Sequence, residues 1–228
     1  MFLFNLPNKF AYLTGCLILA LFWLVIFLMR KDLRKEMVFA SLLGLPMGIT
    51  DYFLVPAYWQ PQSLFGLMEK YRVGLESFLF FFLMAGLSSV FYEFFRGRKI
   101  RKIARDKGLH LLPIIAAVGF FLFLASVFPG KTVYWFILTG VFGASFIIAF
   151  ISDLLKQALF GAFAFALFYL LVFAYVIFIF PRLVADFYNV PNLLGVFAMG
   201  VPLEEILAAF FAGAFWSIMY EFVKGYRV

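Results

Sequence analysis

Seven long apolar segments dominate this sequence and limit the environment in which the chain can fold. They cover roughly residues 10–29, 37–55, 74–95, 110–128, 132–151, 157–180 and 196–223. A run of about 18 or more apolar residues is typical of a membrane-spanning helix. Hydrophobic residues make up 66% of the chain, including 36 Phe, which is more than a soluble domain of 228 residues could bury. We therefore predict an all-α integral membrane protein with seven transmembrane helices.

The sequence also contains an internal repeat. Leu75-Glu76 and Tyr92-Glu93 recur as Leu203-Glu204 and Tyr220-Glu221, each 128 residues further along the chain. Residues 46–56 and 181–191 share a second pattern of Pro, four residues, Asp, two aromatic residues, any residue, Val and Pro. One apolar segment separates two sets of three, so both sets cross the membrane in the same direction. We predict two parallel three-helix repeats, residues 1–98 and 131–228, joined by a basic cytoplasmic loop and a linker helix within residues 99–130.

The distribution of basic residues predicts the orientation. Fourteen of the 19 Lys and Arg fall in the loops after the first, third and fifth segments or at the C-terminus. The positive-inside rule then predicts a multi-pass cell-membrane protein with its N-terminus outside and its C-terminus in the cytoplasm. We interpret the basic run at 96–107 as an orientation signal that contacts lipid headgroups. The net charge of +7 is therefore not taken as a sign of nucleic-acid binding.

Five acidic residues are predicted to lie at the outer ends of the helices, where basic residues are few. They are Asp51, Glu76, Asp186, Glu204 and Glu205. An acid in the first turn of a helix can simply cap it, because it interacts favourably with the free N–H groups there. Crowded carboxyls in an apolar setting cannot all ionise, and one that keeps its proton is a general acid. We take all five as candidate catalytic residues. Glu204 and Glu205 lie about 100° apart around a helix, so only one of them can point fully inward.

The second pair of repeated glutamates is interpreted differently. Glu93 and Glu221 each have a basic residue three positions later, Arg96 and Lys224. That spacing is typical of an ion pair on a helix surface. We predict that these two glutamates are structural anchors at the cytoplasmic rim.

Metal and cofactor sites are not indicated. Cys16 is the single cysteine and lies within an apolar segment, and His110 is the single histidine. Without clusters of cysteine and histidine, no zinc or haem site can be argued. We expect neither a cofactor nor a bound metal.

Several of these motifs together resemble the integral-membrane, flavin-free lycopene cyclase domain, which occurs as heterodimers or fused tandem domains. The residues that carry the resemblance are the Pro-Leu-Glu-Glu motif at 202–205, Asp186, Asp51, Tyr58-Trp59, residues 74–80 and Tyr92-Glu93. The resemblance implies redox-neutral cyclisation of the ends of a linear carotenoid, started by a protonating acid. It places that acid at Glu204 or Glu205, with Glu76 as the counterpart in the first repeat. The first repeat departs from the motif, with Gly74 in place of Pro202 and Ser77 in place of Glu205, which favours the second repeat for the working acid.

The resemblance implies a lipid-soluble, lycopene-like polyene as substrate and membrane lipids as surroundings, and it leaves a homo-oligomer open. The main alternative is a small transporter, because some carriers also have three-plus-one-plus-three parallel repeats. Polar residues are scarce midway along the segments, which argues against a hydrophilic cargo. A retinal-binding protein is disfavoured because the last segment, 196–223, has no lysine. A purely structural membrane protein and a related carotenoid end-group activity also stay open.

Overall fold

A computed structural model describes residues 7–97, 101–102 and 111–227 of the chain. Its long helices are α1 (Ala11–Met29), α2 (Arg34–Gly44), α5 (Leu75–Arg96), α6 (Leu112–Val127), α7 (Thr132–Phe150), α8 (Leu155–Ile179) and α10 (Leu203–Lys224). The short helices are η1 (Asn8–Phe10), η2 (Leu45–Thr50), α3 (Asp51–Leu54), η3 (Leu64–Gly66), α4 (Leu67–Tyr71), η4 (Ser152–Leu154), α9 (Leu183–Phe187) and η5 (Val190–Asn192). Four two-residue strands pair as two antiparallel ladders, Arg101–Lys102 (β1) with Tyr226–Arg227 (β4) and Phe197–Ala198 (β2) with Val201–Pro202 (β3).

The expected number of membrane spans is met only in part. Among the described residues, six helical segments are long and apolar enough to cross a membrane: Asn8–Met29, Arg34–Leu54, Leu75–Arg96, Thr132–Phe150, Ser152–Ile179 and Leu203–Lys224. The predicted linker helix is present as α6, but its described length of 16 residues is short for a span. The last predicted segment, 196–223, begins too early, because Phe197–Pro202 form a β-hairpin and the helix starts at Leu203.

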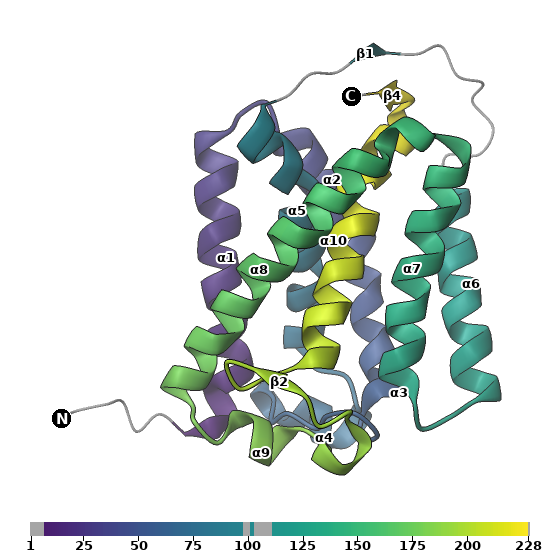
Figure 1. Cartoon of the computed structure of the whole chain (residues 1–228). Coiled ribbons are helices and arrows are strands. Elements are labelled where there is room, and N and C mark those ends of the chain that lie inside the picture. The colour runs from purple at the N-terminus through teal and green to yellow at the C-terminus, as the bar shows by residue number, and fades with distance from the viewer. Residues whose placement is uncertain (1–6, 98–100, 103–110, 228) are drawn as a thin grey trace.

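The long helices form one bundle with their short connections gathered at the ends (Figure 1). α1, α5, α7 and α10 run upward in this view, while α2, α6 and α8 run downward. The most extensive helix packing joins α8 to α10 and α2 to α5, which are corresponding pairs in the two predicted repeats. The elements α3, α4, α9 and β2 lie at the lower end, beside the first turns of α5 and α10.

Two connections from different parts of the chain are joined at this lower end. The segment after α3 and the segment after α9 form a β-bridge between Trp59 and Tyr188. The backbone N–H of Asn189 also donates to the carbonyl of Tyr58 at 2.9 Å. These bonds satisfy backbone groups that would otherwise be costly to bury. They also bring Tyr58, Trp59 and Tyr188 to one place.

Glycines allow the closest helix contacts in both helix pairs. A side chain at Gly213 of α10 would meet the carbonyl oxygen of Gly161 on α8 at 2.7 Å. A side chain at Gly44 of α2 would meet Ala85 and the carbonyl oxygen of Phe81 on α5 at 2.4 and 2.7 Å. Small residues at such crossings let the helix backbones approach each other, which is a common basis of helix association in membranes.

Two sequence interpretations fall largely outside the described residues. His110 lies there, and so does most of the basic run at 96–107. Within the described part, β1 pairs with β4, which links the segment after α5 to the residues after α10.

Candidate active site

Side chains from both sets of helices line a large apolar cavity. They include residues in the first turns of α1 and α10, which lie at the lower end of the bundle in Figure 1. Side chains from α1, α3, α5, α7, α8, α9 and α10 line the cavity. Many of them are aromatic: Tyr12, Tyr58, Trp59, Phe80, Phe81, Phe136, Tyr169, Phe173, Phe187, Tyr188 and Trp216. Two carboxyls, those of Asp51 and Glu205, also face this cavity.

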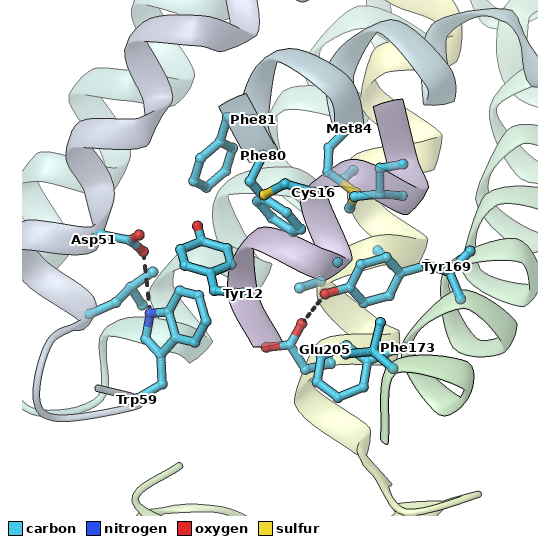
Figure 2. Close-up of a pocket in the computed structure, with 18 of the residues that line it drawn as sticks. Tyr12, Cys16, Asp51, Trp59, Phe80, Phe81, Met84, Tyr169, Phe173 and Glu205 are labelled. Carbon is cyan, nitrogen blue, oxygen red and sulfur yellow. Dashed lines mark hydrogen bonds between the residues drawn. The ribbon is translucent and has the colours of Figure 1, made fainter. Parts of the chain in front are cut away.

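The carboxyl of Glu205 is held by three tyrosine hydroxyls. Tyr58 and Tyr188 donate to its Oε1 at 2.9 and 2.8 Å. Tyr169 of α8 donates to Oε2 at 2.6 Å (Figure 2). The donors come from three different segments, so the carboxyl of Glu205 ties α10 to α8 and to both lower connections.

These phenols keep their protons at neutral pH. Burial raises the pKa of Tyr58 well above 10.0, and the nearby charge of Glu205 raises it further. The same two causes, in the same order, raise the pKa of Tyr188. A raised pKa leaves the O–H group available as a hydrogen-bond donor.

The carboxyl of Asp51 has fewer hydrogen-bond partners than the carboxyl of Glu205. It is 1% exposed, and its Oδ1 accepts a hydrogen bond from Trp59 Nε1 at 3.3 Å (Figure 2). Its Oδ2 has no hydrogen-bond partner among the described residues, and the same holds for the buried hydroxyl of Tyr12. The hydroxyl of Ser77 lies next to Asp51. In the view of Figure 2, the Tyr12 ring lies between Asp51 and Glu205.

Glu76 and Glu204 hold corresponding loops in the two predicted repeats. Both lie in the first turn of a long helix, as predicted. Glu204 Oε1 accepts from the backbone N–H of Leu194 at 2.6 Å, and Glu76 Oε1 accepts from that of Leu64 at 2.6 Å. Tyr134 also donates to Glu204 Oε1, at 3.1 Å. Both glutamates are buried, their Oε2 atoms have no partner in the described chain, and neither is among the cavity-lining residues.

Asp186 differs from its sequence counterpart Asp51. It is exposed, forms an ion pair with Arg182 at 3.1 Å and accepts a hydrogen bond from Asn8 at 2.5 Å. It does not line the large cavity. The structure therefore brings Asp51 and Glu205 together at the cavity and leaves Glu76, Glu204 and Asp186 around it.

Known proteins were compared with the chain by family models, curated sequences and solved structures. The model described as "Lycopene cyclase" matches residues 9–95 and 131–223, which is more than half of the chain. The chain belongs to the lycopene cyclase family. No curated protein and no solved structure matched. Family membership supports a carotenoid cyclase-like function and a lipophilic carotenoid substrate.

The sequence analysis did not predict that three tyrosines donate hydrogen bonds to Glu205 in this member of the lycopene cyclase family. Tyr169 carried a usable signal, because a buried phenol within an apolar segment requires a hydrogen-bond partner. Tyr58 and Tyr188 lie within or just after the repeated Asp blocks, and only the fold shows that they approach the same carboxyl.

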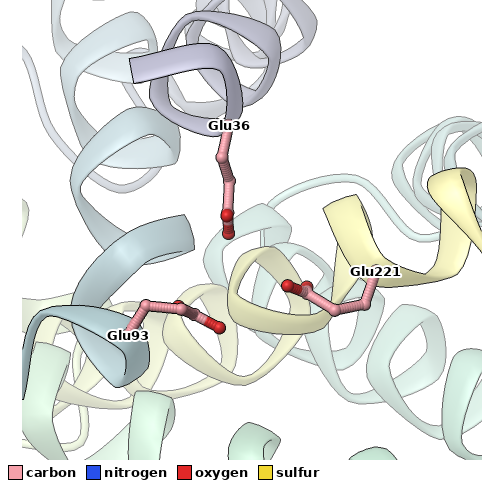
Figure 3. A group of neighbouring side chains, drawn as sticks. All are labelled: Glu36, Glu93 and Glu221. Carbon is pink, nitrogen blue, oxygen red and sulfur yellow. The ribbon is translucent and has the colours of Figure 1, made fainter. Parts of the chain in front are cut away.

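A second group of carboxyls lies at the opposite end of the bundle. Glu36 of α2, Glu93 of α5 and Glu221 of α10 point toward one another (Figure 3), and one oxygen from each lies within 4.8 Å of the others. All three are buried, and Gln157 Nε2 donates to Glu93 Oε1 at 2.8 Å. The prediction that Glu93 and Glu221 are on the helix surface is therefore wrong. Helices α2 and α8 cover the helix faces that carry these glutamates. Carboxylate oxygens at this spacing are the ligand type that hard cations prefer.

Proposed function

We propose that this protein cyclises the end groups of a linear carotenoid within the membrane. The reaction is an isomerisation that starts with protonation of a terminal double bond and ends with loss of a proton. The observation that carries this proposal is the pair of carboxyls, Asp51 and Glu205, in one aromatic cavity. Aromatic ring faces stabilise a passing carbocation, and an apolar lining suits a polyene better than a polar solute.

The proposed orientation places this cavity toward the outer side of the membrane. The cavity lies at the end where α1 begins, and the N-terminus is assigned outside by the distribution of basic residues. The substrate would enter from the lipid, since a carotenoid dissolves in the bilayer. No comparison supports the alternative of a transporter.

The test is expression in a host that accumulates lycopene, followed by chromatography of the pigments. We expect monocyclic or bicyclic carotenoids to appear at the expense of lycopene. Membrane fractions must show that the protein is present. Unchanged lycopene in cells that contain well-expressed, monodisperse protein would reject the cyclase proposal.

A further inference from the structure

We propose that, within the cyclisation proposed above, Asp51 donates the initiating proton while Glu205 works as a carboxylate that stabilises the cation and accepts the closing proton. The division rests on that proposed function and on the different hydrogen-bond environments of the two carboxyls. Each repeat supplies one carboxyl to the cavity, but from different positions in the motif. The first repeat has Ser77 where the second has Glu205, and the second has an exposed Asp186 where the first has the buried Asp51.

The hydrogen bonds around Glu205 favour its ionised form. Three O–H groups donate to its two oxygens, from Tyr58, Tyr188 and Tyr169. An ionised carboxylate only accepts hydrogen bonds and has room for all three donors, whereas a protonated carboxyl uses one oxygen to carry its own proton. Hydrogen bonds from O–H groups to a carboxylate are also stronger than those between neutral groups.

The environment of Asp51 favours its protonated form. Its single described hydrogen bond, from Trp59, is long at 3.3 Å, and Oδ2 is buried without a partner in the described residues. A buried charge with so few donors is costly, whereas a neutral carboxyl is much less so. A proton on Oδ2 gives Asp51 an O–H group at the wall of the cavity that holds the substrate.

The proposed steps balance without an oxidant or a reductant. The Asp51 O–H bond breaks and its proton forms a C–H bond at the terminal double bond of the polyene. The electron pair of the next double bond forms the ring C–C bond, which moves the positive charge to a ring carbon. A neighbouring C–H bond then breaks, its electrons form the new double bond, and its proton passes to Glu205. Proton exchange with water restores both groups before the next turnover.

The negative charge of Glu205 supplies the electrostatic part of this mechanism. A fixed carboxylate in an apolar site lowers the energy of the cation that develops beside it. The tyrosines hold that carboxylate in place, so they are positioning residues. The position of Glu205 relative to the cation also determines which proton is removed and therefore which ring isomer forms.

Infrared difference spectroscopy of the purified protein tests the two protonation states without relying on activity. We expect the C=O band of a protonated carboxyl to disappear in Asp51→Asn and to persist in Glu205→Gln. The carboxylate band should show the reverse. Asp186→Asn, at an exposed ion pair outside the cavity, is the matched control and should leave the protonated band unchanged. A protonated band that is lost in Glu205→Gln, or that is unchanged in Asp51→Asn, overturns the assignment.

Product analysis provides a second readout on the same variants. Asp51→Asn should form no ring, and Asp51→Glu should restore part of the activity. Glu205→Gln should convert less lycopene and yield a different ratio of ring isomers, because the closing proton leaves to another acceptor. The assignment of the two roles is contradicted if Asp51→Asn still forms rings with an altered isomer ratio while Glu205→Gln forms no cyclic product. If wild type yields no cyclic product, the proposed function fails, while the infrared result still decides the protonation states.

Discussion

Replacing both cavity carboxyls, Asp51→Asn together with Glu205→Gln, is expected to abolish cyclisation of lycopene. A positioned acid or base contributes on the order of 10²–10⁴-fold to the rate, so loss of both should reduce turnover below detection. The amides keep the approximate size of the side chains, and the cavity should keep its shape. Conversion is measured by pigment chromatography at matched protein levels in the membrane.

The internal repeat provides a control for this double variant. Asp186 occupies the same place in its motif as Asp51, but it is exposed and paired with Arg182. Asp186→Asn should therefore retain most of the wild-type conversion. Equal loss of activity in Asp186→Asn, or substantial ring formation by the double variant, would show that the chemistry is not located in this cavity.

Substitution of Gly213 by Val is expected to destabilise the helix bundle. An added Cβ would lie 2.7 Å from the Gly161 carbonyl oxygen, 3.0 Å from Phe165 Cβ and 3.1 Å from Ala162 Cα. Two of these three atoms belong to the backbone of α8, so a change of rotamer cannot relieve the clash. Overpacking of this kind typically costs about 1–3 kcal/mol. Thermal unfolding in detergent and the yield of monodisperse protein measure the effect.

Gly119 offers the matched control on α6. A Cβ added there meets no atom within 4 Å, and the residue is exposed. Gly119→Val should therefore unfold at nearly the same temperature as wild type. Similar unfolding temperatures for both glycine variants would mean that the close approach of α8 and α10 is not a source of stability.

The sequence was sufficient for the approximate positions of the long apolar helices and for the first-turn positions of Glu76 and Glu204, although it placed the start of the last segment too early. Both properties depend on local features, namely long apolar runs and helix-start signals. The sequence did not indicate which of Glu204 and Glu205 faces the cavity. Glu205 lines it, whereas Glu204 is buried and accepts from the backbone N–H of Leu194. This difference depends on how α10 packs against α8, and the tyrosine from α8 that binds Glu205 is 36 residues away along the chain.

Local sequence patterns were poor predictors of which acidic side chains are buried. Asp51 and Asp186 share one motif, yet Asp51 is buried beside Trp59, while Asp186 is exposed and contacts Asn8 and Arg182. Glu93 has a basic residue three positions later, which favoured a surface ion pair. Tertiary packing instead places its carboxyl beside Glu36 and Glu221, and no spacing within one helix could indicate that arrangement.

The most direct test of the proposed chemistry follows the incoming proton. Purified protein in lipid bilayers is equilibrated in deuterium oxide and supplied with lycopene, and the products are examined by mass spectrometry. If an exchangeable carboxyl protonates the polyene, each new ring should carry one deuterium on a carbon atom. Cyclic product without deuterium would contradict protonation by an exchangeable acid, and the absence of cyclic product from folded protein would contradict the cyclase function itself.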